Sequence, residues 1–207
     1  KMMETGPLRR WLYQSAMRSL RAQAGRSRAG WGLAERMRHG LWYLLVLRAL
    51  LNFTGLRRLR YGFSGAAPIS PELLTFFRIL GVPLREVYGM TQTCGIALGQ
   101  QTDASPVGSI GRAIPGLEAR LGPDGELQMR GDQIFAGYYR NPQASAEALQ
   151  GGWLHSGDMA EATANDEFRI VDRKKDIIIT AGGKNISPSE VENALKSSPY
   201  IREAVII

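Results

Sequence analysis

The sequence is poor in cysteine, in long apolar runs and, over its first 60 residues, in acidic side chains. Its one cysteine, Cys94, excludes an intrachain disulfide framework and a metal site built from cysteines alone, and it fits a reducing compartment. The longest apolar stretch, residues 41–53, is interrupted by Arg48 and is too short to span a bilayer. Residues 1–7 hold no apolar segment of the kind found in signal peptides. We therefore expect a cytoplasmic protein, and 207 residues leave room for a sizeable core.

The shortage of acidic residues is confined to one end of the chain. Residues 1–60 contain 13 Lys and Arg against two acidic residues, whereas residues 61–207 contain 13 and 17. Apolar positions every three to four residues predict amphipathic helices over residues 8–26 and 33–51. Basic helices of this kind suit an anionic membrane surface, which would make the protein peripheral there. The alternative that we favour is a helix pair packed on the next layer, and we expect no nucleic-acid partner.

Residues 57–100 have the pattern of α/β structure. The order is a strand, a capped helix and a second strand, over residues 59–64, 70–80 and 82–88. Small residues follow both strands: Gly65, Ala66 and Ala67 follow the first, and Gly89 follows the second. Because ligands of open α/β sheets bind outside the carboxyl ends of the strands, a flat ring could approach the backbone here.

Two side chains near these strand ends have candidate roles. Tyr88 can stack on a flat ring, although it could equally be a core aromatic residue with a satisfied hydroxyl. Thr91 can give its hydroxyl to a phosphate. For Thr91 and Thr93 the alternative is capping of a turn.

Glycine and proline dominate residues 106–140, which are predicted to form a small β subdomain. Pro123-Asp-Gly125 lies between two alternating runs and signals a hairpin. A helix is predicted from Pro142 to about residue 149. Farther on, the pattern predicts a strand, a tight glycine turn and a helix start, at residues 177–179, at Gly182 and Gly183, and at Ser187-Pro188.

Two charged residues have candidate roles: Asp158, shortly after Trp153, and Arg173, shortly before the predicted strand at residues 177–179. A carboxylate only accepts hydrogen bonds, so Asp158 in a tight turn could take both hydroxyls of a ribose, or form an Asx-turn or helix cap instead. Arg173 can fork onto sugar or phosphate oxygens, or belong to a solvated turn. His155 has no carboxylate or serine partner nearby in the sequence, so we expect it to be structural.

Seven motifs occur in one order: Ser64-Gly-Ala-Ala-Pro68, Tyr88-Gly-Met-Thr91, Gly108-Ser-Ile-Gly-Arg-Ala-Ile-Pro-Gly116, Gly125-Glu-Leu-Gln-Met-Arg-Gly131, Gly137-Tyr-Tyr-Arg-Asn-Pro142, Gly152-Trp-Leu-His-Ser-Gly-Asp158 and Asp172-Arg-Lys-Lys-Asp-Ile-Ile-Ile-Thr-Ala-Gly-Gly-Lys-Asn-Ile-Ser-Pro188. Their order and spacing resemble the adenylate-forming superfamily, most closely its long-chain acyl-CoA synthetase branch. The resemblance is close over residues 57–207 and looser before them.

The resemblance implies an α/β fold that combines parts of two domains. Residues 1–174 would be the C-terminal part of the large domain, with a basic helical segment, an α/β part and a β-rich subdomain over residues 1–60, 61–105 and 106–174. Residues 175–207 would hold the hinge and the start of a small α+β C-terminal domain.

The resemblance also implies a two-step ligase reaction. A carboxylate attacks the α-phosphate of ATP, and the thiol of coenzyme A then displaces AMP from the acyl-adenylate. The implied partners are a long-chain fatty acid, ATP, Mg²⁺ and coenzyme A. The implied roles are nucleotide contact for Gly65, Ala66, Ala67, Tyr88 and Gly89, α-phosphate binding for Thr91, ribose binding for Asp158 and Arg173, the catalytic hinge for Lys175, and contact with the coenzyme A arm for Gly182 and Gly183.

Three departures from the family pattern qualify these roles. Gln92 stands where the family usually has a glutamate that helps hold Mg²⁺, and an amide coordinates only through its carbonyl oxygen. The family's phosphate loop is expected before residue 1, and the lysine that contacts the reacting carboxylate is expected beyond Ile207. We therefore expect this fragment alone to be inactive. Two alternatives for the whole protein stay open: a nucleotide-binding homologue without turnover, and a membrane-surface interaction segment.

Overall fold

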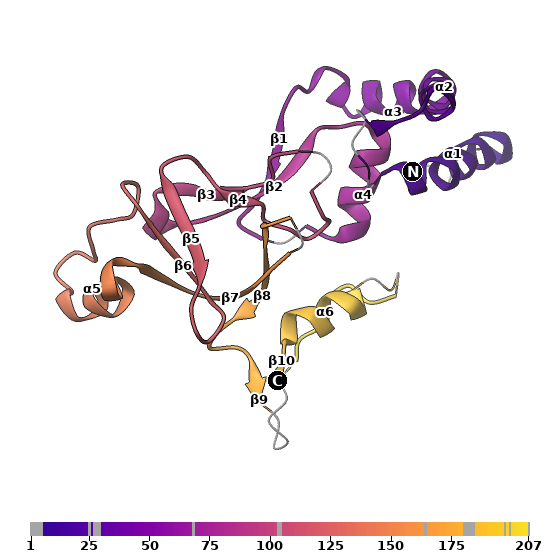
Figure 1. Ribbon diagram of the computed structural model, residues 1–207. Coiled ribbons are helices and arrows are strands. Elements are labelled where there is room, and N and C mark those ends of the chain that lie inside the picture. The colour runs from indigo at the N-terminus through magenta and orange to yellow at the C-terminus, as the bar shows by residue number, and fades with distance from the viewer. Residues whose placement is uncertain are drawn as a thin grey trace. The chain divides into compact units, whose positions relative to one another are not determined.

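The computed structural model describes residues 6–24, 26, 30–67, 69–102, 105–163, 165–179, 185–196, 198 and 200–206 (Figure 1). The chain divides into two compact units, each described by itself below. Unit 1 comprises Lys1–Glu86 and Gln101–Val107, and unit 2 comprises Val87–Gln100 and Gly108–Ile207.

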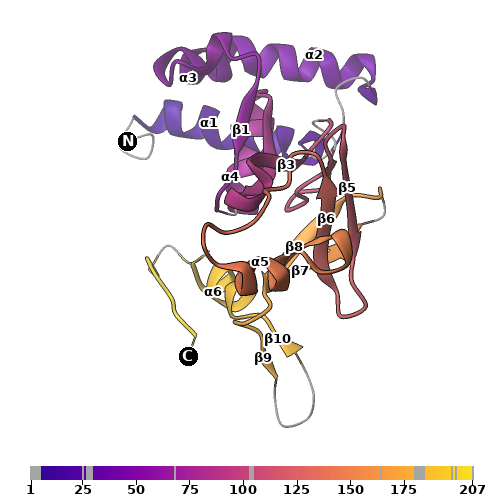
Figure 2. The same cartoon turned by 90° about the vertical axis from the view of Figure 1, so that its left-hand side faces the viewer.

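Unit 1 begins with the two predicted helical segments, which the structure confirms. The first is α1 (Pro7–Leu20), which continues into a 3₁₀ turn (Arg21–Gln23). The second differs from the predicted continuous α-helix, because a π-helical turn (Tyr43–Leu47) separates α2 (Leu33–Trp42) from α3 (Arg48–Phe53). With this wider turn, the consecutive residues Val46 and Leu47 are both buried. Figure 2 shows α1 running beside α2 and α3.

The α/β part of unit 1 also follows the prediction. Strand β1 (Gly62–Ser64) pairs in parallel with the first residues of β2 (Leu84–Met90), and α4 (Pro71–Leu80) connects them. The Oγ of Ser70 accepts a hydrogen bond from the Leu73 N–H at 3.2 Å, which caps α4 as predicted. The core of unit 1 is formed by buried side chains from α1, the π turn, α3, α4 and the residues after α4: Ala16, Leu20, Val46, Leu47, Leu51, Ile79, Leu80 and Val82.

Unit 2 starts with the second part of β2, which pairs antiparallel with β3 (Gly95–Gly99). A 3₁₀ turn (Thr91–Thr93) joins these strands, and β3 pairs in turn with β4 (Arg112–Ala113). A side chain at Gly89 would overlap the backbone of Gly95, and the strand register shifts between Tyr88 and Gly89. Close approach of two strands is therefore reason enough for glycine at position 89.

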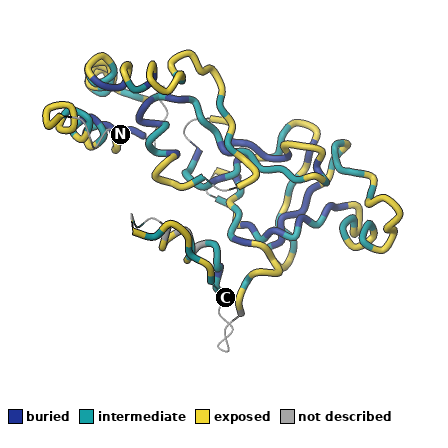
Figure 3. Tube along the Cα trace, turned by 180° about the vertical axis from the view of Figure 1, so that it is seen from behind, coloured by how far each residue is buried: buried dark blue, intermediate teal, exposed yellow. Residues whose placement is uncertain are grey.

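The main sheet of unit 2 is an antiparallel meander of four strands. Its order is β5 (Leu117–Leu121), β6 (Glu126–Gly131), β7 (Leu154–Ala162) and β8 (Phe168–Arg173), with α5 (Pro142–Ala148) between β6 and β7. The predicted hairpin joins β5 and β6, where the Gly122 N–H donates to the Glu126 carbonyl at 2.7 Å. The first four residues of β6 are buried, and buried and partly buried residues alternate along β7 up to Ala160 (Figure 3). The core side chains are Ala97, Leu98, Leu117, Leu127, Met129, Leu154 and Ala160.

After β8 the chain forms a short pair, β9 (Ile178–Ile179) with β10 (Asn185–Ile186), and then α6 (Pro188–Lys196). The predicted strand and helix start are thus confirmed. The start of α6 is held by Asp172 of β8, whose carboxylate accepts from Ser187 Oγ at 2.6 Å and from Ser189 N at 3.0 Å. An aspartate remote in sequence therefore accepts a backbone N–H in the first turn of α6.

Strands β3 and β10 were not predicted, and β7 and β8 lie in the predicted β-rich subdomain but were not located individually. Consequently Asp158, which we expected in a tight turn, lies inside β7. Burial alternates regularly along β7 up to Ala160, but the sequence hid this strand because two of its buried positions carry the polar side chains of Ser156 and Asp158. In the part of the chain that the structure describes, every helix is too short or too polar to cross a membrane. The predicted domain boundary at residue 175 stays a prediction.

Candidate functional site

Asp158 is the centre of the candidate site in unit 2. Its Oδ2 accepts a hydrogen bond from the Tyr88 hydroxyl at 2.6 Å, and its Oδ1 lies 3.0 Å from Nε of Arg173. The register of β7 and β8 places Asp158 directly opposite Arg173, while Tyr88 comes from β2. Three residues that were predicted to bind nucleotide, and that are up to 85 positions apart in the numbering of the chain, are therefore in direct contact.

The carboxylate of Asp158 can accept further hydrogen bonds from a ligand. Burial, followed by the hydrogen bond to Asp158 and its charge, raises the pKa of the Tyr88 hydroxyl above its ordinary value of 10.0. Tyr88 therefore stays protonated and donates to the carboxylate. Each carboxylate oxygen has two lone pairs, so both oxygens can accept one further donor. The side chain of Asp158 is 7% exposed and that of Arg173 is 56% exposed, so the guanidinium is the accessible part of the pair.

A cation–π arrangement holds the start of β7. The ring of the buried Trp153 has the guanidinium carbons of Arg120 and Arg130 at 3.9 and 4.6 Å from its centroid. These arginines belong to β5 and β6, so the ring ties the entrance of β7 to the neighbouring strands. This explains the tryptophan of the motif that ends in Asp158 as a structural residue.

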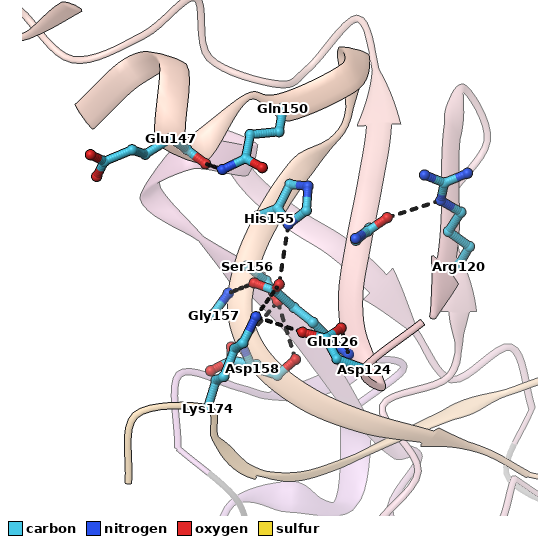
Figure 4. A network of polar contacts seen from close by, with 11 residues as sticks. Arg120, Asp124, Glu126, Glu147, Gln150, His155, Ser156, Gly157, Asp158 and Lys174 are labelled. Atoms are coloured by element: carbon cyan, nitrogen blue, oxygen red, sulfur yellow. Dashed lines mark hydrogen bonds and ion pairs between the residues drawn. The ribbon is translucent and has the colours of Figure 1, made fainter. Parts of the chain in front are cut away.

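A second carboxylate, Glu126, lies behind Asp158 and was not predicted to have a role. Its side chain is 5% exposed and accepts from the Gly157 N–H at 2.8 Å and from Nζ of Lys174 at 3.1 Å, while Nδ1 of His155 lies 3.1 Å away (Figure 4). Burial raises the pKa of Glu126, but the hydrogen bonds from Gly157, His155 and Lys174 outweigh it, and the pKa is lowered overall. The expected structural nature of His155 thus has a physical basis, a partner 29 residues away.

Lys174 also extends this cluster to the β5–β6 hairpin. Its Nζ lies 2.6 Å from Oδ2 of Asp124, and this hydrogen bond raises the pKa of Lys174 and lowers that of Asp124. The one sequence signal that could have indicated Glu126 is its position directly after a glycine turn, at the start of a predicted strand. The structure shows that the first four residues of this strand are buried. A charged residue at a buried strand position needs partners, and the sequence does not say which.

The turn after β2 holds the predicted phosphate and metal residues. Thr91 is exposed, whereas Thr93 is buried and its Oγ1 accepts from the Met90 N–H at 3.0 Å. Thr93 is therefore a turn cap, the alternative stated for it. Gln92 donates from Nε2 to the Tyr138 hydroxyl at 2.6 Å, and its backbone carbonyl accepts from the Phe135 N–H at 2.8 Å.

These contacts bear on magnesium. The described residues hold no group of three His, Cys, Asp or Glu side chains that could bind a metal ion. The amide nitrogen of Gln92 is hydrogen-bonded to Tyr138, so the side chain offers a metal ion only one neutral oxygen, that of its amide. Because Mg²⁺ prefers carboxylate and phosphate oxygens, these residues do not by themselves fit a magnesium site.

The remaining predicted residues lie elsewhere. Gly65, Ala66 and Ala67 follow β1 in unit 1 and are exposed, with Ala66 at a φ of 66°. Lys175 is exposed in the turn after β8. Gly182 and Gly183 lie outside the described residues.

Comparison with known proteins gives one family and consistent relatives. The model of the family described as AMP-binding enzyme matches residues 11–139. Over 181 residues the chain is 39% identical to the long-chain-fatty-acid–CoA ligase FadD15 of Mycobacterium bovis, an alignment that covers 87% of this chain and 30% of FadD15.

The structural relatives agree with this match. The o-succinylbenzoate CoA synthetase MenE of Bacillus subtilis, in complex with the acyl-adenylate intermediate OSB-AMP, is 29% identical with a TM-score of 0.69, covering 77% of this chain and 35% of MenE. The same enzyme in complex with ATP and a magnesium ion is 30% identical with a TM-score of 0.68, covering 76% of this chain and 36% of MenE. The chain therefore spans about a third of the length of these relatives.

Proposed function

The chain belongs to the AMP-binding enzyme family, and from this we propose that the whole protein is an ATP-dependent fatty acid–CoA ligase. In the first step a carboxylate oxygen of the acid attacks the α-phosphorus of ATP. The bond between the α-phosphorus and the bridging oxygen breaks, and pyrophosphate leaves with the electron pair. In the second step the sulfur of coenzyme A attacks the acyl carbon, AMP leaves, and the thiol proton passes to solvent.

The observation that carries this proposal is that Asp158 contacts both Tyr88 and Arg173 in a chain that belongs to this family. A buried carboxylate whose two oxygens have remaining acceptor capacity matches the two hydroxyls of a ribose. The tyrosine ring beside it provides an aromatic face for adenine. The protein contributes mainly orientation and charge to such a reaction, so fixed groups of this kind are what the chemistry requires.

Other residues complete the proposed site. Gly65, Ala66 and Ala67 would lie along adenine, and the exposed hydroxyl of Thr91 would bind the α-phosphate. Lys175 would be the pivot between the two half-reactions, and Gly182 and Gly183 would contact coenzyme A. Similarity to FadD15, a long-chain-fatty-acid–CoA ligase, supports a long-chain acid as the substrate.

The described residues do not by themselves provide a magnesium site, so we derive no step through this ion. Gln92→Glu tests whether position 92 limits metal use, because a glutamate could still accept from the Tyr138 hydroxyl. If the amide is a defect, the variant should raise the Mg²⁺-dependent rate by roughly 2- to 10-fold. An unchanged rate would assign the metal to other groups of the full-length protein.

The proposed function is tested by pyrophosphate exchange in the full-length protein. Fatty acid should stimulate the exchange of labelled pyrophosphate into ATP, and coenzyme A should then yield a thioester. If the protein binds ATP but no acid of any chain length supports exchange, the protein is a nucleotide-binding homologue without turnover.

A second proposal concerns the basic helices, which would hold the protein peripherally at a membrane in a reducing compartment. The specific observation is an exposed apolar stripe on α2 and the π turn at helical spacing, flanked by arginines: Leu33, Met37, Leu41, Leu44 and Leu45. Full-length protein should co-sediment with anionic liposomes at low salt and be released at high salt. If it does not bind, the stripe packs against the remainder of the protein.

A further inference from the structure

The β6–β7 pairing is interrupted where the candidate site lies. Glu126 pairs with Met159 and Gln128 pairs with His155, so the three residues 156–158 stand opposite the single residue Leu127. This bulge lets Gly157 adopt a φ of 72° and contains Asp158. The backbone groups of the bulge cannot all bond across the sheet, and they need other partners.

Side chains and the end of β8 supply these partners. The Gly157 N–H donates to Oε1 of Glu126 at 2.8 Å, and the Asp158 N–H donates to Oγ of Ser156 at 3.0 Å. The Gly157 carbonyl accepts from the Lys174 N–H at 2.9 Å. The bulge is therefore held at the N–H and carbonyl of Gly157 and at the N–H of Asp158, and Glu126 bonds the residue just before Asp158.

Glu126 reaches the other half of the pair as well. Lys174, which follows Arg173, donates from Nζ to Oε2 of Glu126 at 3.1 Å. The same carboxylate thus bonds one chain neighbour of Asp158 and one chain neighbour of Arg173 (Figure 4). His155 occupies a further position on Oε2, at 3.1 Å.

We propose that Glu126 is a positioning residue that holds the Asp158–Arg173 pair in the geometry that binds ribose. This rests on the proposed function, since it names what orients the nucleotide site. Glu126 acts through the bulge and through Lys174, without touching the ligand. An anionic carboxylate is needed, because glutamine in the same place has one acceptor oxygen and would turn its amide nitrogen toward the ammonium of Lys174 or the ring of His155.

The test is AMP binding by the full-length protein and by its Glu126→Gln variant, measured by calorimetry. We expect the Kd for AMP to rise about tenfold, since a hydrogen-bonded buried charge is lost. In steady-state assays the KM for ATP should rise similarly, while the KM for the fatty acid stays within about twofold. If Glu126 had a purely structural role, the variant would have a lower melting temperature, and the KM values for ATP and for the fatty acid would not change differently.

The matched control is Glu118→Gln in the same sheet. Glu118 is exposed on β5 and pairs with the exposed Arg130 at 2.7 Å, so the variant loses one carboxylate and one ion pair without affecting the bulge. Its Kd for AMP should stay within about twofold of the wild-type value.

A second variant keeps the test decisive if Glu126→Gln does not fold. Lys174→Met removes a half-exposed partner and should raise the Kd for AMP about threefold. An unchanged Kd in Lys174→Met, or in folded Glu126→Gln, overturns the positioning role while wild-type AMP binding leaves the proposed function standing. Wild-type protein that binds no AMP overturns both.

Discussion

The two units differ in how many carboxylates they bury. The core of unit 1 is an apolar cluster of helical side chains, and among its described charged residues only Arg78 and Glu86 are buried. Unit 2 has an apolar core of similar size but also buries the carboxylates Glu126, Asp158 and Asp172, each with several hydrogen-bond donors. Buried charge is costly unless it is fully paired, so the larger number of buried carboxylates in unit 2 marks it as the unit where hydrogen-bond geometry adds most to packing.

The largest expected effect is the loss of stability when a core leucine is truncated, and it tests whether damage to the core of each unit also affects AMP binding. Leu47→Ala in unit 1 and Leu127→Ala in unit 2 remove fully buried side chains, and each should lower the free energy of unfolding by about 2–5 kcal/mol. Because Leu127 stands opposite the bulge, only its variant should also weaken AMP binding in the folded protein. Denaturant titration and calorimetry measure the two effects, and weakened binding in Leu47→Ala would contradict the separation.

Asp158→Ala should weaken AMP binding by about 1.5–3 kcal/mol, through the loss of charge-assisted hydrogen bonds to the ribose. It also removes the acceptor of Tyr88 and the partner of Arg173. Calorimetry on the full-length protein measures the affinity. Glu72→Ala, at an exposed position of α4 in unit 1, is the control and should bind AMP normally. Equal affinity in the two variants would remove Asp158 from the site.

The acid sensitivity of folding should belong to unit 2. The pKa values of Glu126 and Asp172 are lowered from 4.5 and 3.8, because donated hydrogen bonds outweigh burial. A carboxyl with a lowered pKa adds stability above its unfolded-state pKa, and this is lost as pH falls through the folded value. For Glu126 the groups that face it are Lys174, His155 and, through Lys174, Asp124.

Denaturant titrations from about pH 7 to about pH 3 should therefore show a stability decline in the wild-type protein that is shallower in Glu126→Gln and Asp172→Asn. Glu72→Gln in unit 1 should retain the wild-type slope. A decline of the same steepness in all four proteins would show that these buried carboxylates are not its source.

The smallest effect is expected for exposed ion pairs, which both units have. Arg26–Glu35 in unit 1 and Arg130–Glu118 in unit 2 have N–O distances of 2.8 and 2.7 Å; the side chain of Glu35 is 24% exposed and the other three are more than half exposed. Glu35→Gln and Glu118→Gln should each change the free energy of unfolding by about 0–1 kcal/mol. A much larger loss in either unit would show that exposure is the wrong criterion for comparing them.

Local signals predicted a good part of the fold. Ser70 and Pro71 predicted the start of α4, and Pro123-Asp-Gly125 predicted the β5–β6 hairpin, because caps and turns depend on adjacent residues. Motif order also identified Tyr88, Asp158 and Arg173, which the structure brings into contact.

Features that depend on distant residues were missed. Glu126 takes its donors from positions 29, 31 and 48 residues away. Strand β7 was missed because Ser156 and Asp158 are polar at buried positions, and their partners are not evident from the sequence. The π turn at Tyr43–Leu47 was missed for a related reason: an apolar run fits an α-helix and a wider turn equally well, and only packing distinguishes them.

The cap of α6 has a consequence for motion. Asp172 precedes Lys175, the proposed pivot, whereas Ser187 and Ser189 follow it. Their hydrogen bonds therefore tether the two sides of the pivot in the orientation seen here. A rotation that carried α6 away from β8 would deprive a buried carboxylate of these donors and uncover the first turn of the helix. If Lys175 is a pivot, a second orientation would have to offer Asp172 equivalent partners, and the cap of α6 would then favour the orientation seen here.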